Sequence, residues 1–120
     1  MEKMPFNNLE KKVIEWYVSH FPKTAVSAQL ESASLKKREW TRHGYYIYFD
    51  IDHRPEPSFE KERSPLVKIP IPGPIIKSTS IDEDGGCLLW AENGFLTALE
   101  MYANGDSFAE NVSDFSLVDP

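Results

Sequence analysis

Residues 88–99, Leu-Leu-Trp-Ala-Glu-Asn-Gly-Phe-Leu-Thr-Ala-Leu, consist of two apolar runs joined by Asn93-Gly94. Asn-Gly between two such runs is the strongest short signal of a β-hairpin with a two-residue turn. A turn of that length fixes the register. The predicted opposite pairs are Glu92 and Phe95, Trp90 and Thr97, Leu88 and Leu99, and Cys87 and Glu100.

Both faces of this hairpin are predicted to be apolar. One face carries Leu88, Trp90, Phe95, Leu99 and Met101, and the other carries Cys87, Leu89, Ala91, Leu96 and Ala98. Such a hairpin is either covered twice within the fold, or covered once by a helix and once by another chain. The second arrangement leaves open a homodimer formed through residues 87–102.

An amphipathic helix is predicted near the N-terminus. Asn7 and Glu10 have the spacing of a capping box, and Pro22 ends the element. The apolar side, at helical spacing, carries Leu9, Val13, Trp16, Tyr17 and His20. This stripe is typical of a helix that packs on a sheet. Because His20 shares the apolar side, we interpret it first as a hydrogen-bonded histidine at the edge of the core.

The rest of the chain is predicted to be strands and turns. Val26, Ala28 and Leu30 alternate with polar residues, which indicates a half-buried strand. Further strands are predicted over 37–41 and 45–51, with a turn at His43-Gly44. Residues 53–65 read as a surface loop and 66–72 as an extended or edge segment. A last strand or extended tail is expected around Phe115, Leu117 and Val118.

Together these elements predict a single α+β domain over residues 1–120. The N-terminal amphipathic helix packs on one antiparallel sheet of five or six strands, in a cystatin-like or related arrangement. A chain of 120 residues, 41% of them hydrophobic and 27% charged, is long enough for one core and has an ordinary globular composition.

Charge and length bound the function. Nineteen acidic side chains against thirteen basic ones give a formal charge of −6. Such a field repels a phosphate backbone, so no nucleic-acid partner is expected, whereas a basic protein partner would be attracted. No apolar run is long enough to span a bilayer, and the N-terminus lacks the apolar core of a secretory signal. We therefore expect no membrane association and a cytoplasmic location.

No catalytic motif, metal site or cofactor site is recognised. The sequence lacks a glycine-rich phosphate loop, a Gly-x-Ser-x-Gly elbow and a His-Glu-x-x-His motif. The only cysteine, Cys87, lies in an apolar run and is expected to pack as a small hydrophobic side chain. We predict no cofactor, no metal and no catalytic residue, and an enzymatic role is the less favoured interpretation.

Two groups of residues are candidates for binding. In the strand 45–51, Tyr45, Ile47, Phe49 and Ile51 share the core face. The second face continues past the strand and carries Tyr46, Tyr48, Asp50 and Asp52, a wet or functional surface. The two aspartates there could hold a cation or act as an acid/base pair, although a solvated role is favoured.

The second group is a pocket or a structural pair. If Glu100 lies between apolar strands it needs a partner, for which Arg38 and His20 are candidates. Trp16, His20 and Glu100 would then line a pocket between the helix and the sheet.

Two segments resemble a family of small uncharacterised bacterial proteins. Residues 38–49, Arg-Glu-Trp-Thr-Arg-His-Gly-Tyr-Tyr-Ile-Tyr-Phe, resemble its Arg-Glu-x-Thr-Gly-x-Gly-aromatic segment, with Arg42 in place of the first glycine. Residues 86–102 resemble its Leu-Phe-x-x-x-Gly-x-Leu-x-x-Leu-Glu-x-Tyr hairpin. The resemblance covers about a quarter of the chain. It implies that Arg38, Glu39, Gly44, Gly94, Glu100 and Tyr102 act together, in folding or in a site.

The resembled family has no established activity to transfer, but its size and charge are similar to those of immunity proteins that neutralise toxins. The first hypothesis is therefore a non-enzymatic, immunity-like binding protein that masks a basic toxin or another protein partner through an acidic, aromatic surface. The alternative is a small-ligand-binding protein or unrecognised enzyme with the pocket between helix and sheet. A flat acidic face over a solid core favours the first, and an enclosed polar pocket favours the second.

Overall fold

The computed structural model describes residues 5–51, 69–92 and 94–120. In these residues two helices, α1 (Asn8–His20) and α2 (Ala25–Ser32), precede seven strands. The strands are β1 (Ala33–Trp40), β2 (Gly44–Ile51), β3 (Ile71–Pro72), β4 (Ile75–Lys77), β5 (Gly85–Glu92), β6 (Phe95–Ala103) and β7 (Ser116–Val118).

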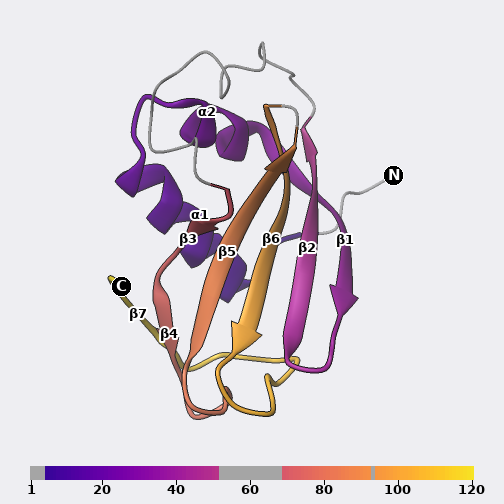
Figure 1. Cartoon of the computed structure of the whole chain (residues 1–120), viewed down its shortest axis with the longest axis vertical. Coiled ribbons are helices and arrows are strands. Elements are labelled where there is room, and N and C mark those ends of the chain that lie inside the picture. The colour runs from indigo at the N-terminus through magenta and orange to yellow at the C-terminus, as the bar shows by residue number, and fades with distance from the viewer. Residues whose placement is uncertain (1–4, 52–68, 93) are drawn as a thin grey trace.

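The strands form one antiparallel sheet, in the order β1-β2-β6-β5-β4-β7, with β3 paired to β5 beside this path. Both helices lie behind the sheet in Figure 1, and α2 contacts β2 and β6. The predicted α+β class, with an N-terminal helix on a single antiparallel sheet, is confirmed. A second helix, α2, follows the first, and the described strands number seven where five or six were predicted. Three of the seven strands, β3, β4 and β7, are only two or three residues long. The predicted last strand is β7, which pairs with β4.

The first helix forms as predicted. The Asn7 side chain accepts a hydrogen bond from the Glu10 backbone N–H, and the Glu10 carboxylate accepts one from the Asn7 N–H, each at 2.8 Å. This capping box satisfies two N–H groups that have no partner within the helix. Leu9, Val13 and Tyr17 are buried against the sheet.

The prediction of a strand around residues 26–31 is wrong, because this segment is helix α2. Thr24 caps it, and Thr24 and Ser27 form a second capping box. Val26 and Leu30 are buried and Ala28 is exposed, which is the four-residue spacing of a helix. In so short a segment, apolar residues four positions apart fit both the helical and the strand period. The N-terminal cap at Thr24 is therefore what distinguishes a helix from a strand here.

The hairpin forms as predicted, but its register differs beyond the first two pairs. Glu92 faces Phe95 and Ala91 faces Leu96, after which a bulge leaves Thr97 unpaired and Trp90 faces Ala98. Leu88 therefore faces Glu100, not Leu99, and Cys87 faces Met101. The predicted register is wrong because one extra residue in a strand shifts every later pair.

The bulge also changes which side chains share a face. Toward the helices the hairpin presents Cys87, Leu89, Leu96, Leu99 and Met101, all buried. Leu88, Trp90 and Glu100 lie on the other face and are partly exposed. The prediction of two apolar faces is therefore wrong: Leu99 and Met101 belong with Cys87 and Leu89, and the other face carries a carboxylate.

The strands β1 and β2 confirm most of the predicted pattern. In β2, Tyr45, Ile47 and Phe49 are buried, whereas Tyr46 and Tyr48 are partly exposed and Asp50 is exposed. The preceding turn lies at residues 41–43, and β1 begins four residues before the predicted strand. Asp52, the predicted loop 53–65 and residues 66–68 lie outside the described residues.

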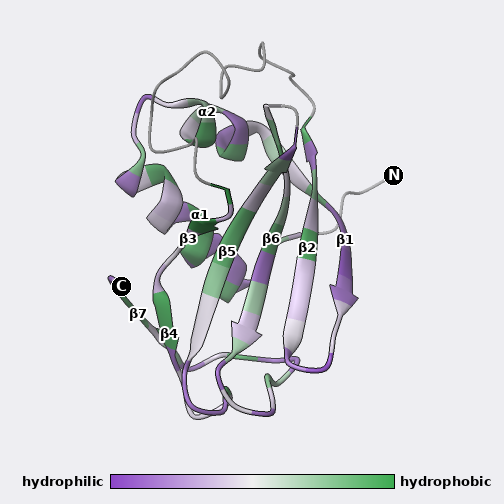
Figure 2. Cartoon of the chain, viewed as in Figure 1, coloured by the Kyte–Doolittle hydropathy of each residue, from purple (hydrophilic) through white to green (hydrophobic). Residues whose placement is uncertain are grey.

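The outermost strand on one side, β1, is mostly hydrophilic, whereas β5 and β6 in the middle of the sheet are mainly hydrophobic (Figure 2). A charged edge strand with a bulge, such as the one between Leu35 and Lys37, discourages pairing with a second sheet.

Candidate functional site

The face of the sheet turned away from the helices carries a row of aromatic and acidic side chains, which we call the outer face. Its members, from β2, β5 and β6, are Tyr46, Tyr48, Asp50, Leu88, Trp90, Glu100 and Tyr102. The register places Tyr46 opposite Glu100, and Glu100 opposite Leu88. Figure 1 looks onto this face, and among the described residues no helix lies over it.

Glu100 lies at the centre of the outer face between two aromatic residues. The indole Nε1 of Trp90 donates a hydrogen bond of 3.1 Å to the Glu100 carboxylate, and Tyr46 lies opposite Glu100 on β2. Hydrogen bonds to a charged acceptor are stronger than neutral ones. The carboxylate is therefore kept in one position although it is only partly buried.

Tyr46 and Tyr48, the outward-facing tyrosines of β2, form a stacked pair beside Glu100. Their ring centroids are 6.1 Å apart with an interplanar angle of 25°. The Tyr48 hydroxyl donates to Glu39 at 3.3 Å, and the Lys37 ammonium lies 4.8 Å from the Tyr48 ring centroid. Partial desolvation raises the pKa of both phenols. The negative charge of Glu100 raises the pKa of Tyr46 further, and that of Glu39 does the same for Tyr48. Both rings therefore stay neutral hydrogen-bond donors at physiological pH.

The aromatic row continues onto β6. Tyr102 lies opposite Gly86, and its ring occupies the space above that glycine, since a Cβ added to Gly86 would lie 2.4 Å from the Tyr102 hydroxyl oxygen. The absence of a side chain at Gly86 thus leaves room for the Tyr102 ring. Sequence reasoning had linked Tyr102 with Glu100 only through the family resemblance, and their places two residues apart on one strand put both on the outer face.

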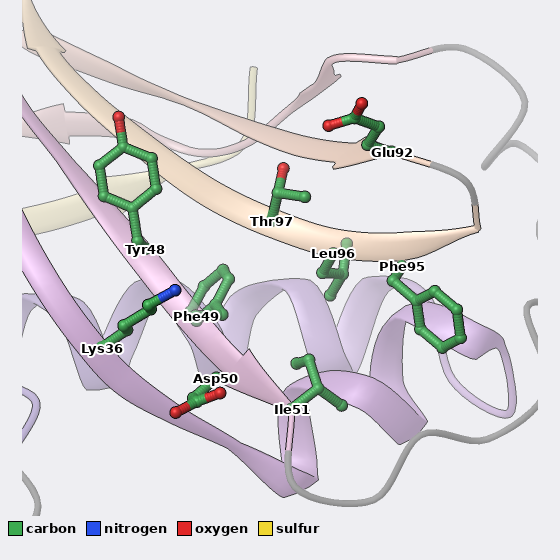
Figure 3. A pocket seen from close by; sticks show the side chains of 9 residues that line it. All are labelled: Lys36, Tyr48, Phe49, Asp50, Ile51, Glu92, Phe95, Leu96 and Thr97. Carbon is green, nitrogen blue, oxygen red and sulfur yellow. The ribbon is translucent and has the colours of Figure 1, made fainter.

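A cleft opens at one end of the outer face, where β2 and β6 diverge beyond the Tyr48–Ala98 pair (Figure 3). It has a volume of about 340 Å³, and its lining residues are Lys36, Tyr48, Phe49, Asp50, Ile51, Glu92, Phe95, Leu96 and Thr97. Asp50, from β2, and Glu92, from β5, lie on opposite sides of it. Sequence reasoning missed this cleft because it depends on the bulge at Thr97.

A buried side chain from α2 explains why the strands diverge there. The Gln29 amide nitrogen donates to the Gly94 carbonyl at 3.0 Å, and its oxygen accepts from the Leu96 N–H at 2.7 Å. Gln29 is fully buried and supplies hydrogen bonds to the hairpin beyond the last β2–β6 pair. These backbone groups at the start of β6 therefore have hydrogen-bond partners without pairing to β2. The two strands can separate there, which leaves room for the cleft.

The predicted pairing of Arg38 with Glu100 is wrong. Arg38 faces Ile47 on the helix side of the sheet, while Glu100 lies on the outer face. Arg38 instead binds Glu10 of α1 through two hydrogen bonds, 2.8 Å from Nε and 2.7 Å from Nη2. The Tyr45 hydroxyl donates to the same carboxylate at 2.8 Å. Sequence reasoning assigned Glu10 only a capping role, and its spacing gave no sign of the distant Arg38.

The predicted pocket among Trp16, His20 and Glu100 does not form. Trp16 and His20 stack on α1 with ring centroids 3.9 Å apart, and both reach Asp119 near the C-terminus. His20 is exposed and not at the edge of the core. Glu100 lies on the opposite face of the sheet, so the three side chains never meet. Within the described residues, no buried side-chain nitrogen or oxygen lacks a hydrogen-bond partner.

Cys87 and the acidic residues show no metal chemistry in the described part of the chain. Cys87 is 2% exposed, and burial raises the pKa of its thiol. No group of three or more histidine, cysteine, aspartate or glutamate side chains there is arranged to hold a metal ion.

Among the helices described, none is long and apolar enough to cross a bilayer.

Comparisons with protein-family models, curated proteins and solved structures found no match to this chain. The resemblance to small bacterial proteins and the cystatin-like arrangement therefore stay predictions, and the function must be inferred from the outer face and its cleft.

Proposed function

We propose that this chain is a non-enzymatic binding protein that masks a basic protein partner, in the manner of an immunity protein, through the outer face of its sheet. The observation that supports this most is the row formed by Tyr46, Tyr48, Trp90 and Tyr102 around the ordered Glu100 carboxylate. Aromatic side chains are enriched at the centres of protein interfaces, where they contribute much of the binding energy.

The charges around this row favour a basic partner. Glu39, Asp50, Glu92 and Glu100 contribute four negative charges on or beside the outer face, against Lys36 and Lys37. The whole chain has a formal charge of −6, which includes these side chains. A basic protein would be steered toward such a surface, and its cations could contact both the carboxylates and the tyrosine rings.

The alternative, a pocket between helix and sheet for a small ligand or a reaction, has less support. The residues proposed for it do not meet, and the region between α1 and β2 is occupied by the paired Glu10, Arg38 and Tyr45 side chains. A second copy of this chain is also a weaker candidate for the outer face, because two surfaces with the same excess of negative charge repel each other.

The test is a pull-down from a bacterial lysate with the tagged protein, at low and at moderate salt, followed by mass spectrometry. The proposal expects a stoichiometric basic protein that is captured by the wild type and lost from a Tyr46→Ala, Trp90→Ala double variant. Higher salt should weaken the capture, since rim charges are screened. A clean lane, or capture that the double variant retains, argues against the outer face as the binding surface.

A further inference from the structure

We infer that the cleft between the end of β2 and the β5–β6 hairpin binds one arginine side chain of the basic partner. This inference rests on the proposed function and names the chemical group that the outer face recognises. The cleft adjoins the outer face directly, because Tyr48 and Asp50 belong to both. A partner seated on the tyrosine row would therefore place some of its side chains at the cleft.

The shape and lining of the cleft suit a long, flat cation. Its volume of about 340 Å³ is at the small end of the range of ligand pockets and leaves room for one extended side chain. Tyr48 and Phe95 provide aromatic walls, and Phe49, Ile51 and Leu96 provide apolar surface. The methylene stem of arginine packs on apolar surface, and the guanidinium stacks on aromatic rings better than an ammonium does.

The polar groups in the cleft match the guanidinium. The carboxylates of Asp50 and Glu92 lie on opposite sides of it, and neither makes an ion pair with any of the residues that the structure describes (Figure 3). A guanidinium has five donors in a planar fork and can serve carboxylates on two sides, while the Thr97 hydroxyl adds an acceptor.

One residue opposes the proposed occupant. Lys36 also lines the cleft, and its ammonium points into it beside Phe49 in Figure 3. With two carboxylates the cleft still has an excess of one negative charge, but the lysine must weaken the attraction of a cation. Lys36→Gln should therefore tighten arginine binding, which is the reverse of its effect on a cleft built for an anion.

The test measures binding of a hexa-arginine amide by calorimetry and by NMR shifts, with hexa-citrulline as the matched neutral probe of the same shape. The wild type should bind the arginine probe and not the citrulline probe, with shifts at Tyr48, Phe95 and Thr97. Asp50→Asn and Glu92→Gln should each weaken binding about tenfold, the effect of losing a charged hydrogen-bond partner. Lys36→Gln should strengthen it.

The controls are Glu83→Gln and Glu110→Gln, which remove the same charge from exposed positions outside the cleft. If these controls weakened binding of the arginine probe equally, the effect would come from net charge alone and the inference would be overturned. NMR shifts located elsewhere on the protein would also overturn it. Folding of each variant is checked by circular dichroism.

The outcome is separable from that of the proposed function. Capture of a basic partner that depends on Tyr46 and Trp90 but not on Asp50 and Glu92 would overturn the arginine cleft and leave the outer-face proposal standing. If every one of these variants still bound the partner, both the arginine cleft and the outer-face proposal would be overturned.

Discussion

Glu10 accepts four hydrogen bonds from three residues through one fully buried carboxylate. The donors are the Asn7 backbone N–H, the Arg38 guanidinium, which donates twice, and the Tyr45 hydroxyl. These contacts join the start of α1 to β1 and β2, so a single acidic side chain fixes the helix on the sheet. The Arg38 side chain is 26% exposed, whereas the Glu10 side chain is 0% exposed. The hydrogen bonding of Arg38 to the Glu10 carboxylate, more than the charge of that carboxylate, raises the pKa of Arg38.

Glu10→Gln should lower the free energy of unfolding by about 3 kcal/mol, near the lower end for a broken buried ion pair, because Arg38 can partly return to water. Urea unfolding measures this. Glu100→Gln is the matched control: its carboxylate is partly exposed, and the amide oxygen can still accept from Trp90, so a loss of about 1 kcal/mol or less is expected. Equal losses in the two variants would contradict this difference between the faces.

Cys87 should be inert toward thiol reagents in the folded protein. Its side chain is 2% exposed, it donates to the Pro74 carbonyl at 3.7 Å, and burial raises the pKa of its thiol. Reaction with a chromogenic disulfide at pH 8 should thus be very slow and should accelerate on addition of urea in parallel with unfolding. Rapid reaction without denaturant would show that the strand pair β5–β6 opens locally.

At the scale of elements, the helix α2 determines how the sheet ends. Its Gln29 amide binds the Gly94 carbonyl and the Leu96 N–H, beyond the last β2–β6 pair. The buried Gln29 amide has a hydrogen-bond partner for both its nitrogen and its oxygen. It therefore specifies one arrangement of the hairpin end on α2, because any other leaves buried polar groups unpaired. The cleft of the proposed arginine site thus depends on a residue that never lines it.

Gln29→Leu should expose the hairpin end to exchange. Two backbone groups lose their partner, so the unfolding free energy should fall by about 1–3 kcal/mol for a buried unsatisfied group. Hydrogen exchange should accelerate most at the Leu96 amide. Glu31→Gln on the same helix is exposed and should leave that amide unchanged. Unaltered protection of Leu96 in the Gln29 variant would mean that the hairpin end is held by other contacts.

The elements also show what local sequence can predict. The hairpin, the α1 capping box and the alternation in β2 were predictable because each depends on neighbours in the chain. Segment 25–32 was misassigned because its short apolar pattern fits both periods, and the cap at Thr24 decided it. The bulge at Thr97 and the Glu10–Arg38 pair follow from long-range packing, which no local pattern encodes.

At the scale of the whole molecule, the helices cover one face of the sheet and leave the other with the tyrosine row and Glu100. Of the predicted binding residues, Tyr46, Tyr48 and Asp50 were placed on the open face by alternation alone. Trp90 was assigned to an apolar, covered face, because without the bulge Leu99 and Met101 of β6 would share its side of the hairpin. The surface could thus be predicted in part from β2 but not from β5 and β6.

Buried phenols and the buried thiol should make the fold sensitive to alkali. Burial raises the pKa of Tyr17 and Cys87, and burial followed by Glu10 raises that of Tyr45. The unfolded chain releases these protons near the ordinary values of 9.0 and 10.0, whereas the folded chain retains them. The unfolding free energy should be unaffected by these groups below pH 9 and fall as the pH rises above it. Urea midpoints from pH 7 to 11 measure this, and a flat profile would contradict the burial of all three groups.

The most direct test of the central claim compares capture of the proposed basic partner by matched surface variants. Tyr46→Ala with Trp90→Ala removes two rings of the outer face. Glu39→Lys reverses a charge on β1 beside that face, and Trp16→Ala removes a ring from α1 on the other side. If the outer face binds, the first two proteins should lose a stoichiometric basic partner that the wild type and Trp16→Ala retain. Retention by all four, or loss only from Trp16→Ala, would place binding elsewhere and contradict the account.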